Sequence, residues 1–149
     1  ANIKTLLKLC PKGKVQGIDY SAVSVEKARK VNASAIAAGR CNVQQASVAE
    51  LPFEAEQFDV VTAFETVYFW PELAQNFREV YRVLKPGGTF FICNEANGET
   101  AKDDKWTQII DGMTIYTDTA LKTYLEQAGF CKIQSHKNKK GWLCVTARK

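Results

Sequence analysis

Short apolar runs alternate with segments of helical periodicity along most of this chain, and this alternation is what most constrains its fold. The apolar runs lie at Val15–Tyr20, Asn42–Val48, Phe58–Ala63 and Thr89–Cys93. Strands that alternate with helices usually pair in parallel, with the helices packed on the faces of the sheet. The sequence therefore predicts an α/β fold with a doubly wound, mostly parallel sheet.

The end of the chain has a different pattern. Phe130–Ser135 and Trp142–Ala147 are strand-like segments joined by a short basic turn, which is typical of an antiparallel hairpin. A chain of 149 residues that is 46% hydrophobic has the size of one domain with one core. We therefore expect residues 1–149 to form a single domain that ends in this hairpin.

Capping residues mark the ends of two of the expected helices. Ser21 is placed to cap a helix whose apolar residues extend to Ile36, and Gly39 can end that helix in a left-handed conformation. Thr117 or Asp118 can cap a later helix that Gly129 stops. Near the amino terminus, the spacing of apolar residues predicts a helix that begins almost at residue 1 and ends before Pro11.

Composition excludes several classes of function. The five cysteines are an odd number, are widely separated and lack Cys-x-x-Cys spacing, so they indicate reduced thiols and no metal site. No leader and no membrane-spanning run is evident, which favours a cytoplasmic protein without a membrane partner. The lysine cluster at 137–140 has the character of a solvated turn, with a phosphate-binding patch as the alternative, and no nucleic-acid partner is expected.

The segment from Phe58 to Trp70 carries the first candidate site. Ligands in parallel α/β sheets bind beyond the carboxyl ends of the strands, and an apolar strand here ends in Glu65 and a group of aromatic residues. Two alternatives remain for these side chains. The aromatic residues Tyr68–Trp70 can serve packing alone, and Glu65 can cap a helix that Pro71 opens.

The second candidate is Asp19, at the end of an earlier strand. A carboxylate in that place can accept two hydrogen bonds from a ribose diol, although a cap or turn that serves the helix after Ser21 is the alternative. Ser47 and Val48 follow the next strand, where a hydroxyl and an apolar face suit an adenine.

In their order and spacing, these segments resemble the class I S-adenosylmethionine-dependent methyltransferases, particularly those that act on small molecules. The resemblance covers nearly the whole chain and implies a Rossmann-like fold. It rests on Gly17–Ser21, Leu51-Pro-Phe53 followed by Phe58–Val61, Phe77-Arg-Glu-Val-Tyr-Arg-Val-Leu-Lys-Pro-Gly-Gly88, and the helix and hairpin from Tyr116 onward.

The resemblance implies S-adenosylmethionine as cofactor and a role for each matching residue. Asp19 would hold the ribose and Tyr20 would stack near the adenine, while Ser47, where the family often has an aspartate, and Val48 would contact the base. Phe64 would border the methionine end of the cofactor. Glu65 and Tyr68 are the catalytic candidates for transfer to a small-molecule acceptor. Glu65 could hold the methionine ammonium, orient the acceptor or remove its proton, and Tyr68 could favour the cationic methyl through its ring face.

The family's first strand and its glycine-rich turn have no counterpart before the helix that begins at residue 1. We therefore expect an amino-terminally incomplete domain, whose first strand is lost, disordered or supplied by a partner chain or a second copy. A noncatalytic methyltransferase-like subunit is one alternative function. A nicotinamide-dependent oxidoreductase is another, but it lacks both a glycine fingerprint and a Tyr-x-x-x-Lys pair.

Overall fold

The computed structural model describes residues 2–149, with Ala101, Lys102 and Asp104 described in their backbone only. Contacts within the chain divide it into two compact units, and the boundary along the sequence falls between Ser47 and Val48. The assignment of one domain to the whole chain remains a prediction.

The first unit is built from two parallel strands and three helices. Its elements are α1 (Asn2–Leu9), β1 (Val15–Asp19), α2 (Ala22–Val31), α3 (Ala33–Ala37) and β2 (Cys41–Gln45). β1 and β2 pair in parallel, with Val15 opposite Cys41 and Asp19 opposite Gln45. Val25, Cys41 and Val43 form its buried core, against which side chains of α1 and α3 pack.

The helix expected from Ser21 to Gly39 is divided in two at Asn32. The side-chain amide of Asn32 donates a hydrogen bond to the carbonyl of Ala28 at 2.8 Å, which competes with the regular helical pattern. Both expected ends are confirmed. The hydroxyl of Ser21 accepts a hydrogen bond from the backbone N–H of Ser24 at 3.3 Å, and Gly39 has a φ of +67°.

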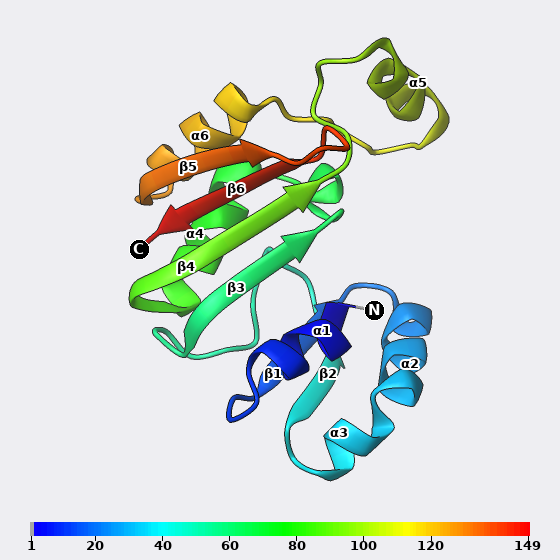
Figure 1. Ribbon diagram of the computed structural model, residues 1–149, viewed down its shortest axis with the longest axis vertical. Helices are drawn as coiled ribbons and strands as arrows, with labels where there is room; N and C mark the ends of the chain where they lie inside the picture. The colour runs from blue at the N-terminus through cyan, green and yellow to red at the C-terminus, as the bar shows by residue number, and fades with distance from the viewer. Residues whose placement is uncertain (1) are drawn as a thin grey trace. The chain divides into compact units, whose positions relative to one another are not determined.

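The second unit contains a four-stranded sheet with two long helices on one face (Figure 1). Its elements are β3 (Phe58–Phe64), the 3-10 helix η1 (Val67–Phe69), α4 (Leu73–Val83), β4 (Leu84–Asn94), α5 (Ala101–Ile109), α6 (Asp118–Gln127), β5 (Cys131–Lys137) and β6 (Leu143–Arg148). The strand order is β3-β4-β6-β5. β3 and β4 are parallel, whereas β6 is antiparallel to both of its neighbours. The α/β class and the carboxyl-terminal antiparallel hairpin are thus confirmed.

The core of the second unit lies between its sheet and helices α4 and α6. Phe90, Ile92 and Val145 point to this side and are at most 1% exposed, as is Phe77 of α4. In the described part of this unit no helix covers the opposite face of the sheet. The expectation that β3 is covered on both faces is therefore wrong: Val60 is 53% exposed, and β3 has β4 as its strand partner along one edge.

Candidate functional site

Asp19 lies where the sequence placed it, at the carboxyl end of β1. The backbone carbonyl of Asp19 accepts a hydrogen bond from the N–H of Ala46 at 3.1 Å, so the carboxyl ends of β1 and β2 lie side by side. One carboxylate oxygen, Oδ1, accepts the N–H of Ser21 at 2.9 Å. Asp19 therefore does serve the turn before α2, and this role uses one of its two carboxylate oxygens.

The residues predicted around the adenine flank these strand ends. Tyr20 is 76% exposed, and its backbone carbonyl accepts a hydrogen bond from the side-chain amide of Gln45 at 2.9 Å. Ser47 is exposed and follows β2 by two residues, and Val48 begins the second unit. The structure thus brings Asp19, Tyr20 and Ser47 to one end of the parallel pair.

Glu65 begins the second cluster, immediately after β3. Its backbone is left-handed, with a φ of +57°, and its N–H donates to the carbonyl of Cys93 at 3.0 Å. Its carboxylate turns toward the end of β4, where Oε1 accepts the N–H of Glu95 at 2.5 Å. Partial removal from water raises the pKa of Glu65, while the hydrogen bond from Glu95 acts in the opposite direction. Glu65 does not cap a helix, because the residue at the start of α4 is Glu72.

Tyr68 joins Glu65 to the segment that follows β4. Its hydroxyl accepts the backbone N–H of Ala96 at 2.8 Å, and both the carbonyl of Ala96 at 3.1 Å and Oε2 of Glu65 at 3.4 Å lie within its donating range. Tyr68 is 3% exposed. Burial, and after it the nearby Glu65 carboxylate, raise the pKa of Tyr68, so the phenol stays protonated at physiological pH and is a donor rather than a base.

The three neighbouring aromatic residues have different environments. Phe69 is 42% exposed. The ring of Trp70 stacks on Phe90 with centroids 6.2 Å apart and meets Phe77 edge to face at 6.0 Å. Trp70 therefore serves packing, Tyr68 is a buried hydrogen-bonding residue, and Phe69 is the aromatic residue open to a ligand.

Sequence reasoning missed a pair of charged residues that holds the loop at Leu51–Phe53. The guanidinium of Arg82 donates to the carbonyls of Leu51 at 3.0 Å and Phe53 at 2.8 Å. It also binds both carboxylate oxygens of Glu79, at 2.8 and 2.9 Å, and Glu79 accepts the N–H of Leu51 at 3.0 Å. The sequence signal was present, because both residues lie inside the Phe77–Gly88 motif, but the spacing does not reveal their target.

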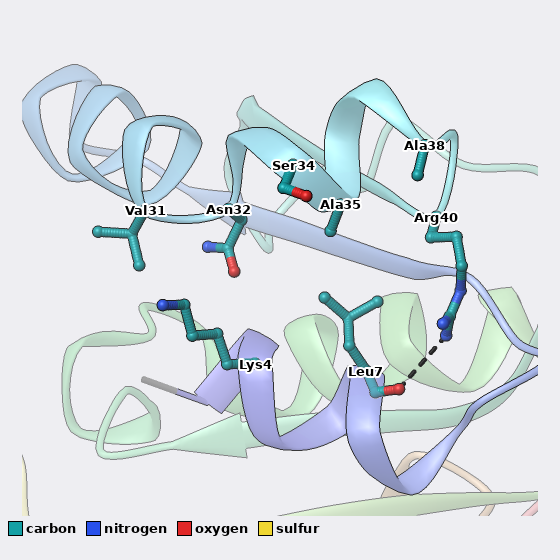
Figure 2. Close-up of a pocket in the computed structure, with 8 residues that line it drawn as sticks. All are labelled: Lys4, Leu7, Val31, Asn32, Ser34, Ala35, Ala38 and Arg40. Atoms are coloured by element: carbon teal, nitrogen blue, oxygen red, sulfur yellow. Dashed lines mark hydrogen bonds between the residues drawn. The ribbon is translucent and has the colours of Figure 1, made fainter.

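A pocket of about 340 Å³ lies in the first unit, and it contains none of the predicted site residues. Figure 2 shows Lys4 and Leu7 of α1 facing Asn32 and Ala35 across it. At the edge of the pocket, the guanidinium of Arg40 donates hydrogen bonds to the carbonyls of Leu7, Cys10 and Gly13. Because the N–H of Val15 binds the carbonyl of Arg40, this edge lies near the amino-terminal end of β1, away from Asp19.

Within residues 2–149, as far as their side chains are described, no group of three His, Cys, Asp or Glu residues is arranged to hold a metal ion. No helix in that part of the chain has both the length and the apolar character needed to cross a bilayer.

Known structures share this fold. The chain aligns with a solved structure described as a complex between the Haloferax volcanii Trm112 methyltransferase activator and a methyltransferase, with a TM-score of 0.84 and 20% identity, over 97% of this chain and 77% of that one. It also aligns with an S-adenosylmethionine-dependent methyltransferase from Aquifex aeolicus, with a TM-score of 0.79 and 18% identity, over 98% of this chain and 74% of that one. At these identities the likeness establishes the fold alone.

Sequence comparison adds the family. The chain is 37% identical over 78 residues to the ubiquinone/menaquinone biosynthesis C-methyltransferase of Geotalea daltonii, a match that covers 52% of this chain and 33% of that protein. The chain thus spans about a third of this curated relative. Residues 1–92 match the family model described as a methyltransferase domain. Because this match covers more than half of the sequence, the chain belongs to the methyltransferase-domain family.

Proposed function

We propose that the protein transfers the methyl group of S-adenosylmethionine to a small-molecule acceptor. The family match carries this proposal, because residues 1–92 include every residue assigned to the candidate site, from Asp19 to Tyr68. The relative from Geotalea daltonii is a C-methyltransferase by name, so acceptors methylated at carbon are the class to assay first.

The cofactor-binding residues in this proposal are Asp19, Tyr20, Ser47, Val48 and Phe64. The carboxylate of Asp19, at the carboxyl end of β1, fits a ribose, because a diol supplies two hydroxyl donors that a carboxylate can accept. The exposed ring of Tyr20 offers a face to the adenine, and Ser47 and Val48 offer a hydroxyl and an apolar surface. Bound S-adenosylmethionine supplies a methyl group that is already activated by its sulfonium.

Glu65 and Tyr68 form the acceptor side of the proposed site. Glu65 contributes a carboxylate that orients the acceptor or takes its proton, and its raised pKa makes the carboxylate a stronger base. Tyr68 acts through Glu65 as a positioning residue, because its hydroxyl is held by Ala96 and faces the Glu65 carboxylate. The catalytic contribution of the chain is thus mainly alignment of two reactants.

Calorimetry with S-adenosylhomocysteine tests the cofactor assignment. We expect Asp19→Ala to weaken binding by about 1.5–3 kcal/mol, because hydrogen bonds to a charged group are lost. Glu26→Ala is the matched control, since Glu26 is a carboxylate of the same unit whose side chain is 67% exposed and pairs with Lys30. Equal affinities of Asp19→Ala and the unchanged protein would refute the role of Asp19.

The alternative function is a noncatalytic methyltransferase-like subunit. The observation in its favour is that β1 and β3 each have a single strand partner in the part of the chain that the structure describes. Binding of S-adenosylhomocysteine separates the two functions: a folded protein that does not bind it would favour the subunit over the enzyme. A homo-oligomer, or a partner chain along these edges, belongs to the same proposal.

A cytoplasmic location completes the proposal. All five cysteines are free thiols in the structure, which suits a reducing compartment.

A further inference from the structure

Two of the free cysteines lie opposite each other on adjacent strands of the four-stranded sheet. Cys93 of β4 is directly opposite Cys144 of β6 in the antiparallel register. Their Sγ atoms are 3.5 Å apart, within the range of a thiol hydrogen bond. Local sequence pattern does not reveal this pair, because 51 positions separate the two residues.

The two thiols differ in their access to solvent. Cys93 is 9% exposed, whereas Cys144 is half-buried and lines a hollow of about 700 Å³ on the face of the sheet that the helices do not cover. His136 of β5 lines the same hollow and lies directly opposite Cys144 in the adjacent strand pair. A small oxidant therefore reaches Cys144 before it reaches Cys93.

We propose that Cys93 and Cys144 form a redox site, in which a hydroperoxide oxidises Cys144 and Cys93 then closes a reversible disulfide. In the first step the Cys144 thiolate attacks the peroxide oxygen, the O–O bond breaks, and the sulfenic acid of Cys144 forms together with water or an alcohol. In the second step the sulfur of Cys93 attacks the sulfenic sulfur, the S–O bond breaks, and the proton of Cys93 leaves with the hydroxyl as water. Two electrons pass from the thiols to the peroxide.

The ionisation of the pair agrees with this order. Burial, and after it the contact with Cys144, raise the pKa of Cys93 to about 12, so Cys93 remains a thiol at neutral pH. Burial, the larger cause, persists after Cys144 is oxidised, so Cys93 reacts as a thiol and loses its proton with the departing hydroxyl.

The two sulfurs are close enough for a bond to form after a small movement. A disulfide requires a sulfur separation of about 2.05 Å, so the two atoms must approach by about 1.5 Å. Directly opposed residues of an antiparallel pair place their Cβ atoms at about 4.5–5.5 Å, at or beyond the upper end of the range that disulfides prefer. Closing the bond therefore requires β4 and β6 to approach each other at this position.

Closing the bond also acts on the candidate site. The carbonyl of Cys93 holds the backbone N–H of Glu65 at 3.0 Å, so a movement of Cys93 toward β6 pulls on the left-handed turn at Glu65. The redox proposal does not depend on methyl transfer, because bond formation is measured directly.

Peptide mapping of the whole reduced protein, treated with hydrogen peroxide while folded, tests the proposal. Trypsin places Cys93 in peptide 83–102 and Cys144 in peptide 141–148. We expect these peptides to appear covalently linked, with the loss of two hydrogens, and to separate again on treatment with dithiothreitol. Oxidation of both cysteines to separate sulfinic acids, or links mainly to the exposed Cys131, would overturn the proposal.

Two single variants test the order of the steps, with dimedone as the probe for sulfenic acid. In Cys93→Ser we expect dimedone to accumulate on Cys144, and in Cys144→Ser we expect Cys93 to remain mostly unlabelled. Cys131→Ser is the matched control and should form the linked peptides as the unchanged protein does. Stronger labelling of Cys93 than of Cys144 would contradict the assigned order.

Discussion

At the residue scale, the hydroxyl of Tyr68 organises the cluster at the end of β3 and β4. Removing it in Tyr68→Phe leaves the buried N–H of Ala96 without its acceptor and the Glu65 carboxylate without its neighbour. We expect the free energy of unfolding to fall by about 1–3 kcal/mol, the cost of a buried unsatisfied donor. Urea denaturation followed by tryptophan fluorescence measures this loss.

Tyr20→Phe is the control for the same chemical change. Tyr20 is 76% exposed, so loss of its hydroxyl should alter stability by less than about 0.5 kcal/mol. If Tyr68→Phe were as stable as the unchanged protein, water would reach Ala96, and Tyr68 would not be the residue that positions Glu65.

At the scale of elements, Glu79 and Arg82 of α4 fasten the loop before β3. The hydrogen bonds from Arg82, and after them the N–H of Leu51, hold the pKa of Glu79 below its usual value of 4.5. A carboxyl whose pKa is lowered on folding adds stability above its unfolded pKa and loses it as the pH falls through the folded pKa. We expect Glu79→Gln to lower the free energy of unfolding by about 1–2 kcal/mol at pH 7. This loss should become smaller as the pH falls below about 4.5.

Glu26→Gln provides the comparison for this pH dependence. Glu26 also pairs with a basic residue of its own helix, but the side chains of Glu26 and Lys30 are 67% and 75% exposed. Replacement of Glu26 should lower the free energy of unfolding by less than about 0.5 kcal/mol at both pH 7 and pH 3. A cost for Glu79→Gln that stayed constant from pH 7 to pH 3 would mean that the charge of Glu79 does not hold the loop.

The same elements show which features the sequence could predict. The caps at Ser21 and Thr117 depend on residues three positions apart, and both were predictable: Thr117 accepts the N–H of Ala120 at 3.2 Å. The hydrogen bond between Arg82 and Leu51 joins residues 31 positions apart, and the position of Cys93 opposite Cys144 depends on strand register. Local sequence pattern predicts neither contact, because the partners are far apart in the sequence. For the candidate site, sequence reasoning found Asp19 and Glu65 at strand ends, but it could not show that Tyr68 was already hydrogen-bonded.

At the scale of the whole molecule, the two units differ in the size of their cores. The first has a two-stranded sheet with a core of Val25, Cys41 and Val43, whereas the second encloses a four-stranded sheet and two covering helices. A two-stranded sheet is marginally stable, and units below about 70 residues rarely hold much stability of their own. We therefore expect the first unit to unfold at a lower urea concentration than the second.

The positions of the tryptophans make this difference measurable in the unlabelled protein. Trp70, Trp106 and Trp142 all lie in the second unit, so fluorescence follows that unit alone, whereas far-ultraviolet circular dichroism also follows α1, α2 and α3. The loss of dichroism should begin before the change in fluorescence, and the amides of β2 should exchange with deuterium faster than those of β4, because local openings follow local stability. Coincident transitions with equal protection of both strands would mean that the chain unfolds as one cooperative domain, as its length alone predicts.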